Sequence, residues 1–270
     1  MDRADRFDGK FVAVSCGIAF MAKASAPGRA KTRLVPPLTF DEAAALNTAF
    51  LHDVADNVLL AARYAGPAAG IAGYAAYGPP GSEDFFRRSL PRSIALIGAW
   101  TPNFGDCLFH TIQEILTRGH GSAVVLNSDS PTLPTALLIE TAAALARPGD
   151  RAVLGPSSDG GYYLLGLKAA HRQMFEDIAW STERVAAQTL ERAREIGLEV
   201  HRLPVWYDVD DVDGLHRLYS ELCGDELDRR SNMHSPHYAI QTAKLMSKLW
   251  QDHAFDRGAG RAMQIDEARA

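Results

Sequence analysis

The chain has 270 residues, of which 47% are hydrophobic and 23% are charged. These values are close to the averages of soluble globular proteins, so they exclude a fibrous or an intrinsically disordered chain. The 28 basic and 33 acidic residues give a formal net charge of −5, which argues against a general binder of nucleic acid or of membrane surfaces. The three cysteines form no CxxC pair, so neither a zinc ribbon nor a disulfide-stapled scaffold is expected.

An uncharged run at residues 11–22 imitates the apolar part of a secretory signal peptide. The residues before it are neutral overall, whereas export requires a positively charged segment there. A buried first strand explains the run better. Residues 64–82 are also uncharged, but their glycines and prolines would break a membrane helix. We therefore expect a cytoplasmic protein with no membrane span and no nucleic-acid partner.

Short apolar runs alternate with helical patterns along the chain, which predicts an α/β domain with a largely parallel sheet. In chain order, the expected strands are 15–22, 69–77, 93–97, 122–126, 152–155, 162–167 and 198–203. The expected helices are a first one from Thr39, then 83–89, 106–118, 135–146, one capped by Ser181 or Thr182 that runs to 196, and one that ends near 222. Thr39 and Glu42 form a capping box for the first helix, and Gly66-Pro67 is expected to end it.

Residues 11–224 are predicted to form this domain, and residues 225–270 a C-terminal helical extension. A helix at about 238–250 carries Leu245 and Leu249 on its apolar side. These two leucines have two interpretations, packing within the chain or a contact in a homo-oligomer. The last fifteen residues are expected to fray.

Four polar segments fall at ends of predicted strands, where open α/β sheets bind their ligands. The loop after the first strand contains Gly28 and four cations but no acid: Lys23, Arg29, Lys31 and Arg33. Such a loop suits a phosphate or diphosphate, with Lys31 as an exposed contact, although a solvated basic turn is the alternative. The loop is not a P-loop, because Ala30 takes the place of the glycine expected before Lys-Thr.

Carboxylates at two other strand ends predict a divalent-cation site. Asp129 follows the run that reads best as a buried strand, and there it must be paired, cap a helix or bind a cation. Asp208 and Asp210 alternate in an extended segment, so both point to one face. Carboxylate oxygens are the ligands that Mg²⁺ prefers in proteins. The alternative for Asp129 is a helix N-cap.

The fourth polar segment places Asp159 directly before Gly160 and Gly161, between two predicted strands. One interpretation is a tight connection between the strands, since Asp-Gly is a common turn pair. The other is a loop that lies over a bound nucleotide or acceptor. The nine histidines are scattered, and neither a GxSxG elbow nor an HExxH motif is present.

Taken in order, these motifs resemble one family, DUF2064, also called the arsenosugar-biosynthesis-type glycosyltransferases, of the nucleotide-diphospho-sugar transferase (GT-A) superfamily. The segments that carry the resemblance are residues 22–34, 128–131, 155–166, 180–182 and 208–210. The resemblance implies a single three-layer α/β/α domain with a mixed, mostly parallel central sheet that binds a nucleotide together with Mg²⁺ or Mn²⁺. Asn127 departs from the family, which more usually has glycine there.

Three functions remain open. In a glycosyltransferase with a nucleotide-sugar donor and a small-molecule acceptor, the metal ligands would be Asp129, Asp208 and Asp210. The other assigned residues would be the catalytic candidates Asp129 and Asp159, and the phosphate-binding Lys23, Gly28, Lys31, Arg33, Gly160 and Gly161. A nucleotidyltransferase of the 2-phospholactate guanylyltransferase type would use the same residues on a nucleoside triphosphate. A nucleotide-binding module without turnover is the third alternative.

Overall fold

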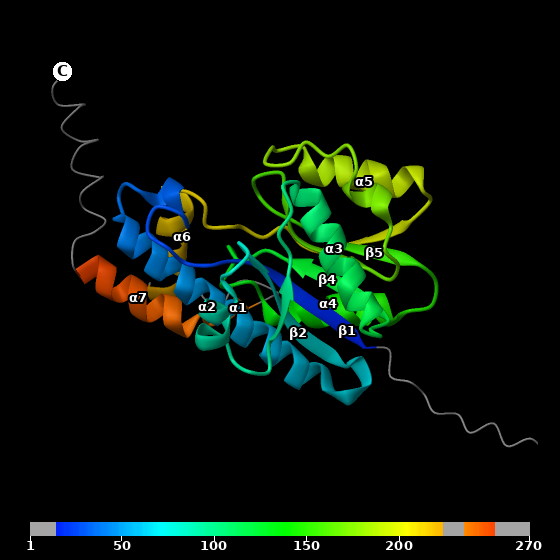
Figure 1. The fold of residues 1–270 in the computed structure, drawn as a ribbon, viewed down its shortest axis with the longest axis horizontal. Coiled ribbons are helices and arrows are strands. Elements are labelled where there is room, and N and C mark those ends of the chain that lie inside the picture. Colours follow the sequence, from blue (N-terminus) through cyan, green and yellow to red (C-terminus); the bar gives the residue numbers. More distant parts are fainter. Residues whose placement is uncertain (1–14, 224–234, 252–270) are drawn as a thin grey trace, which may run out of the picture.

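The centre of the protein is a sheet of seven strands, in a computed structural model that describes residues 15–223 and 235–251 (Figure 1). The strands are β1 (Cys16–Lys23), β2 (Ile71–Gly78), β3 (Ala95–Gly98), β4 (Ser122–Leu126), β5 (Arg151–Pro156), β6 (Tyr162–Leu167) and β7 (Glu199–Arg202). Their order across the sheet is β3-β2-β1-β4-β6-β5-β7. Strand β6 runs antiparallel to both of its neighbours, and the other neighbouring pairs are parallel. The predicted mixed, mostly parallel α/β sheet is therefore confirmed.

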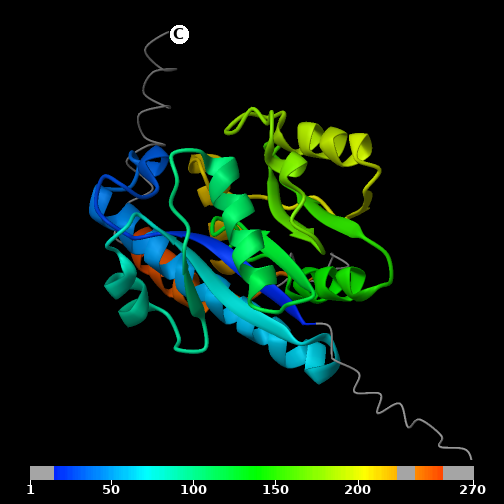
Figure 2. The ribbon, with the colours of Figure 1, turned by 45° about the vertical axis from the view of Figure 1, so that its right-hand side comes forward.

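Helices cover both faces of this sheet (Figures 1 and 2). They are α1 (Phe40–Ala69), α2 (Glu83–Ser89), α3 (Phe104–Thr117), α4 (Thr135–Ala146), α5 (Val185–Glu195), α6 (Val212–Cys223) and α7 (Ile240–Gln251), with two short 3₁₀ turns at Thr32–Leu34 and Arg172–Phe175. Apolar side chains of α1, α4, α6 and α7 share one core cluster with the sheet, while α3 and α5 pack in a second cluster on the other face. This is the three-layer α/β/α arrangement.

The central strand β1 shows why the first apolar run has no charged residue. Its side chains alternate between the two faces, with Ile18 and Phe20 in the core under α1 and Ala19 in the core under α3. Strand β1 pairs with β2 and β4 along its edges, and the helix layers bury both of its faces. Residues 11–14 of that run lie outside the described residues.

Two helix boundaries differ from the prediction. The capping box of Thr39 and Glu42 is present, but α1 continues through Gly66-Pro67 and ends at Ala69. A proline in the last turn removes only one intrahelical hydrogen bond, and the helix stops where Gly70 adopts the left-handed conformation (φ 42°, ψ 54°). The second boundary is the start of α5, which begins at Val185 and not after Thr182, because the hydroxyl of Thr182 donates to the carbonyl of Ala179 and closes a separate turn.

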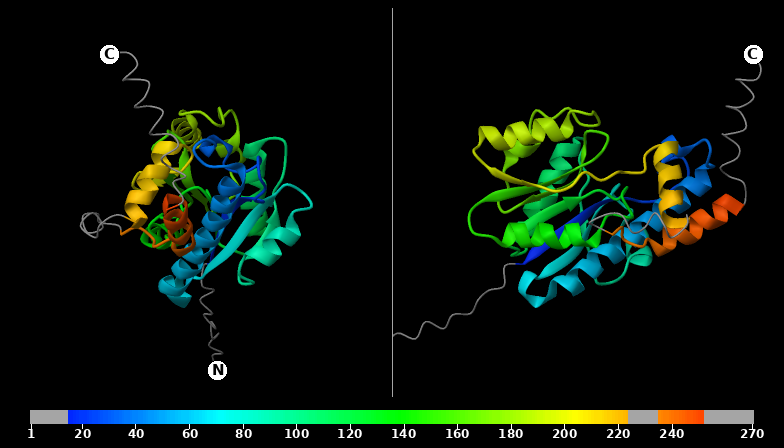
Figure 3. Two further views of the ribbon diagram at one scale, coloured as in Figure 1. Left: turned by 90° about the vertical axis from the view of Figure 1, so that its left-hand side faces the viewer. Right: turned by 180° about the vertical axis from the view of Figure 1, so that it is seen from behind.

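Helix α7 lies alongside α1 at one end of the molecule (Figure 3). Asp53, in the middle of α1, accepts the backbone N–H groups of Gln241 and Thr242 at 3.0 and 2.7 Å and so caps α7 from another helix. Leu249 is buried in the same core as α1, so packing within the chain accounts for it. Residues 225–234 and 252–270 of the predicted extension lie outside the described residues.

Two further observations bear on the expectations about a membrane span and about disulfides. In the described ranges, no helix combines the length and the apolar character that a membrane span requires. Cys16, Cys107 and Cys223 are all free thiols, and the first two are buried.

Candidate functional site

A cavity of about 830 Å³ opens where the carboxyl ends of β1 and β4 meet. The strand order reverses at this point, because β2 lies on one side of β1 and β4 lies on the other. Open α/β sheets bind their ligands at such a switch point. Eight of the predicted site residues line the cavity: Lys23, Lys31, Arg33, Asp129, Asp159, Gly161, Asp208 and Asp210. Gly28 and Gly160 lie outside its lining.

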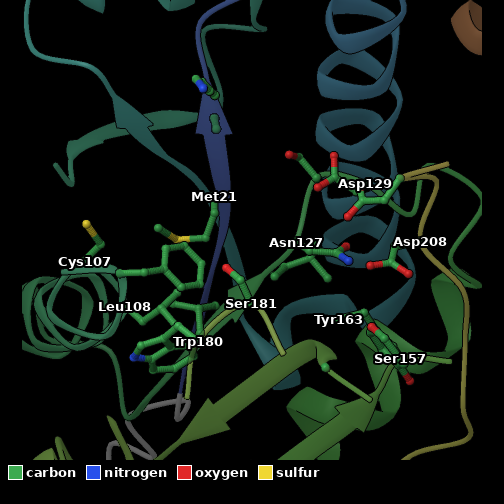
Figure 4. Close-up of a pocket in the computed structure, with 18 of the residues that line it drawn as sticks. Met21, Cys107, Leu108, Asn127, Asp129, Ser157, Tyr163, Trp180, Ser181 and Asp208 are labelled. Atoms are coloured by element: carbon green, nitrogen blue, oxygen red, sulfur yellow. The ribbon is translucent and has the colours of Figure 1, made fainter. Parts of the chain in front are cut away.

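The cavity has two chemically different sides (Figure 4). Asn127, Asp129 and Asp208 gather on one side, whereas Met21, Leu108 and Trp180 gather on the other. The first side offers oxygen ligands and charges, and the second offers flat apolar surfaces. A ligand with a charged part and a ring would match both.

Lys31 reaches the charged side from a constrained backbone. It adopts the left-handed conformation (φ 51°, ψ 36°), which is uncommon for a residue other than glycine, at the start of the 3₁₀ turn Thr32–Leu34. Its Nζ lies 2.6 Å from Asp129 Oδ1, 2.7 Å from the carbonyl oxygen of Val209 and 3.4 Å from Asp210 Oδ1. The Lys31 side chain is only 5% exposed, so the expectation of an exposed lysine is wrong. A lysine can be buried here because two carboxylates neutralise it.

Backbone pairing brings the two carboxylate segments together. The N–H of Val209 donates to the carbonyl of Asp129 at 2.9 Å, and the hydroxyl of Ser130 donates to the carbonyl of Tyr207 at 2.8 Å. Asp129 is not a helix cap, because α4 begins at Thr135 after Pro134 and the Asp129 carboxylate binds Lys31 instead. The N-cap interpretation is therefore wrong.

Asp208 and Asp210 both have altered acidity. The pKa of Asp208 is raised from its ordinary 3.8 to about 6, chiefly by burial and in addition by the negative charges of Asp159, Asp210 and Asp129. Burial and the charge of Asp129 also raise the pKa of Asp210, while Lys31 and Arg33 oppose that rise. The site thus concentrates negative charge that Lys31 and Arg33 only partly offset.

The chemistry of Asp129, Asp208 and Asp210 fits a hard divalent cation such as Mg²⁺ or Mn²⁺. Among the described residues, however, no three carboxylate, histidine or cysteine side chains converge as metal ligands. The ammonium of Lys31 contacts two of these three carboxylates, Asp129 and Asp210. The donor set fits the metal, but two of its members are paired with the chain's own cation.

The loop with Asp159 is both a tight connection and part of the cavity wall. Asp159 Oδ1 accepts the N–H of Gly161 at 2.9 Å, and the N–H of Ser157 donates to the carbonyl of Gly161 at 2.9 Å. Gly160 has φ +88°, and a Cβ there would lie 2.1 Å from the carbonyl oxygen of Glu183. Gly160 therefore allows the turn to pack against the segment before α5, which also lines the cavity.

The sequence analysis missed the aromatic wall of the cavity. Trp100 is 54% exposed and lies directly on Gly78, where a Cβ would stand 2.2 Å from the indole ring. Trp180 forms T-shaped contacts with Phe104 and Tyr162, with ring centroids 5.4 and 6.4 Å apart. The residues of this wall come from four separate segments, so no local sequence pattern predicts it. Tyr162 and Trp180 belonged to motifs of the resemblance, but neither was assigned to the site.

Asn127 was also not predicted to belong to the site. Its amide donates to Ser130 Oγ at 3.2 Å. Because the Ser130 hydroxyl itself donates to Tyr207, Ser130 Oγ can only accept from Asn127, which fixes the orientation of the amide. Asn127 Oδ1 has no hydrogen-bond partner and is buried at the cavity wall.

Comparison with known proteins agrees with this architecture. The family DUF2064, described as an uncharacterized protein conserved in bacteria, matches residues 63–182. A crystal structure from Desulfovibrio desulfuricans G20, named an inferred nucleotide-diphospho-sugar transferase, superimposes with a TM-score of 0.73 at 28% identity, covering 91% of this chain and 98% of that one. The expected resemblance to DUF2064 is confirmed over residues 63–182. The chain has the fold of the nucleotide-diphospho-sugar transferases.

More distant structures share only the general fold of this chain. CMP:2-keto-3-deoxy-manno-octonic acid synthetase in complex with CTP is 13% identical, with a TM-score of 0.47 over 76% of this chain and 97% of that one. A cytidylyltransferase from Leptospira borgpetersenii serovar Hardjo-bovis (strain JB197) is 10% identical, with a TM-score of 0.46 over 88% of this chain and 95% of that one. Both likenesses are too weak to carry a functional argument. No curated protein matches this chain in sequence.

Proposed function

We propose that the protein is a metal-dependent glycosyltransferase that uses a nucleotide-diphospho-sugar donor and a small-molecule acceptor. One observation carries the proposal: the basic loop after β1 and the carboxylates of Asp129, Asp208 and Asp210 line one cavity at the strand switch point. The similar protein from Desulfovibrio desulfuricans, an inferred nucleotide-diphospho-sugar transferase, supports the same class of donor.

The donor diphosphate would bind the cations of the basic loop. Lys23, Arg29 and Arg33 line the cavity, and in the described part of the chain none of them forms an ion pair with a carboxylate. Arginine binds phosphate oxygens through paired N–H groups and lysine binds them as a point charge. Three such cations are sufficient to hold a diphosphate.

The carboxylates Asp129, Asp208 and Asp210 would hold Mg²⁺ or Mn²⁺. When bound, the ion would neutralise the charge that develops on the nucleoside diphosphate as it leaves. The cations of the basic loop would help to stabilise the same charge. The pKa of Asp208, about 6, means that this ligand is mostly ionised at neutral pH.

Asp159 is the proposed base for the acceptor hydroxyl. Its Oδ1 is held by the N–H of Gly161, which fixes the carboxylate at the cavity wall. The proton of the acceptor hydroxyl would pass to the other oxygen, Oδ2. Trp100, Phe104 and Trp180 offer flat surfaces on which a base or sugar ring can stack.

A two-stage experiment tests the function. Nucleotide sugars and nucleoside triphosphates are first screened for thermal stabilisation in the presence of Mn²⁺, and the ligands found are then assayed for turnover with candidate acceptors. Release of a nucleoside diphosphate from a nucleotide sugar is the expected result. Release of pyrophosphate from a triphosphate would instead identify a nucleotidyltransferase, and binding without either product would identify a non-catalytic module.

A further inference from the structure

Lys31 is held by the two segments that carry the proposed metal ligands. Its Nζ contacts Asp129 Oδ1 at 2.6 Å, the carbonyl oxygen of Val209 at 2.7 Å and Asp210 Oδ1 at 3.4 Å. The Phe50 ring lies against the same ammonium, with its centroid 4.9 Å away. The lysine side chain is 5% exposed, whereas those of Asp129 and Asp210 are 35% and 44% exposed. The carboxylates therefore remain accessible from the cavity while the ammonium does not.

A divalent cation and the Lys31 ammonium require the same place. A divalent cation held by Asp129 and Asp210 would need the carboxylate oxygens that Lys31 now contacts, because Mg²⁺ is bound through such oxygens. The Nζ of Lys31 already lies within 3.4 Å of both carboxylates. Two positive ions this close repel each other, so binding of the metal requires the ammonium to leave. The long unbranched side chain of lysine can move without any change in the backbone.

We propose that Lys31 is a built-in competitor of the divalent cation: it neutralises Asp129 and Asp210 in the ligand-free protein, and a metal ion that binds there displaces its ammonium into the cavity. The released ammonium would then face the diphosphate beside Arg33, which also lines the cavity. This ordering, metal first and diphosphate second, rests on the proposed function. The competition itself requires only the metal and the protein.

Calorimetric titration of the full chain with Mn²⁺ alone, without nucleotide, measures the competition. The variant Lys31→Met should bind Mn²⁺ at least tenfold more tightly than the wild type, because the two carboxylates then face each other without a cation. The matched control is Lys23→Met, which removes one positive charge from the same cavity but no recorded contact with a carboxylate. It should change the affinity less than threefold. Equal or weaker binding by Lys31→Met, or no binding by either protein, would overturn the proposal.

A second measurement uses the wild type and does not depend on the folding of a variant. Lysine amines are acetylated with an N-hydroxysuccinimide ester, with and without Mn²⁺, and each lysine is quantified by mass spectrometry. The displaced Lys31 should be labelled several-fold faster when Mn²⁺ is present, while the distant Lys168, whose Nζ contacts the carbonyl of Arg147, should be unaffected. Unchanged labelling of Lys31 at saturating Mn²⁺ would contradict the displacement.

Both readouts are independent of the proposed activity. A protein that binds no nucleotide sugar can still show tighter Mn²⁺ binding in Lys31→Met and faster labelling of Lys31, and then only the proposed function fails. A transferase that works with Lys31 fixed on Asp129 would show neither effect, and then only the competition fails.

Discussion

The backbone N–H of Val209 donates to the backbone carbonyl of Asp129 across 2.9 Å, which joins two segments that are 80 residues apart in the sequence. This bond places the loop after β4 beside the segment before α6. Asp129, Asp208 and Asp210 meet in one cavity as a result, and the carbonyl of Val209 itself accepts from Lys31. The site is thus built on backbone pairing, and single side chains within it can be changed without dispersing it.

Asp129→Asn should abolish Mn²⁺-dependent nucleotide binding. The substitution removes one metal ligand and the closest partner of Lys31. The lysine keeps the Val209 carbonyl and Asp210, so the free energy of unfolding should fall by only about 1–2 kcal/mol, between the values typical of exposed and of buried ion pairs. Nucleotide affinity with and without Mn²⁺ and urea unfolding check the two parts. The control Asp213→Asn, an exposed carboxylate at the start of α6, should leave both unchanged, and an unaltered metal response in Asp129→Asn would exclude it as a ligand.

The stability of the metal-free protein should decrease as the pH rises through about 6. The pKa of Asp208 is raised from 3.8 to about 6, so the folded state binds its proton more tightly than the unfolded state does. This contribution is complete below pH 3.8 and is lost as the pH passes the folded-state pKa of about 6.

Asp208→Asn mimics the protonated form and therefore isolates this effect. Because Asp208 is only half-buried, solvent screening reduces the gain, and the variant should be about 1–2 kcal/mol more stable than the wild type at pH 7.5. The difference should vanish near pH 4. Urea unfolding of both proteins at the two pH values, with a chelator present, measures it. A difference that is the same at both pH values would show that the ionisation of Asp208 is not its source.

The order and type of the elements could be predicted because each one has a local signal. The runs 122–126 and 162–167 are apolar and bounded by turn residues, and they form β4 and β6 with the predicted bounds. Helix ends and strand pairings that depend on tertiary contacts could not be predicted as well from the sequence. Gly66-Pro67 has the local signal of a helix end, yet α1 continues to Ala69. Strand β6 pairs antiparallel with β4 and β5, and its own residues do not specify this direction.

The composition of the site could be predicted, but its contacts could not. Carboxylates and cations at strand ends are visible in the sequence because strand ends meet at one edge of the sheet. The burial of Lys31 depends on a contact with Asp129, 98 residues later in the chain. The aromatic wall likewise combines Trp100, Phe104, Tyr162 and Trp180 from separate segments. These contacts arise from packing between elements, which local patterns do not specify.

Asp53→Ala should loosen α7 from α1. The variant removes the two carboxylate oxygens that accept the N–H groups of Gln241 and Thr242, and the bond to Thr242 is buried. The free energy of unfolding should therefore fall by about 2 kcal/mol. Asp53→Asn is the matched control, since its one amide oxygen can replace part of the cap at about half that loss. Urea unfolding gives the energies, and amide hydrogen exchange at Gln241 and Thr242 locates the change. Exchange that is unaltered in Asp53→Ala would show that Asp53 does not hold α7.

Gly160→Ala should destabilise the turn that closes one side of the cavity. Gly160 has φ +88°, and an added Cβ would lie 2.1 Å from the Glu183 carbonyl oxygen, a backbone atom that cannot rotate away. We expect a loss of about 2–4 kcal/mol, the sum of the left-handed conformation and the steric overlap. Gly81→Ala separates the two effects, because Gly81 has φ +83° and no heavy atom within 4 Å of its added Cβ. That control should lose only about 1 kcal/mol, the conformational part alone. Urea unfolding of the two variants gives the difference directly, and equal losses would mean that the turn does not pack tightly against the segment before α5.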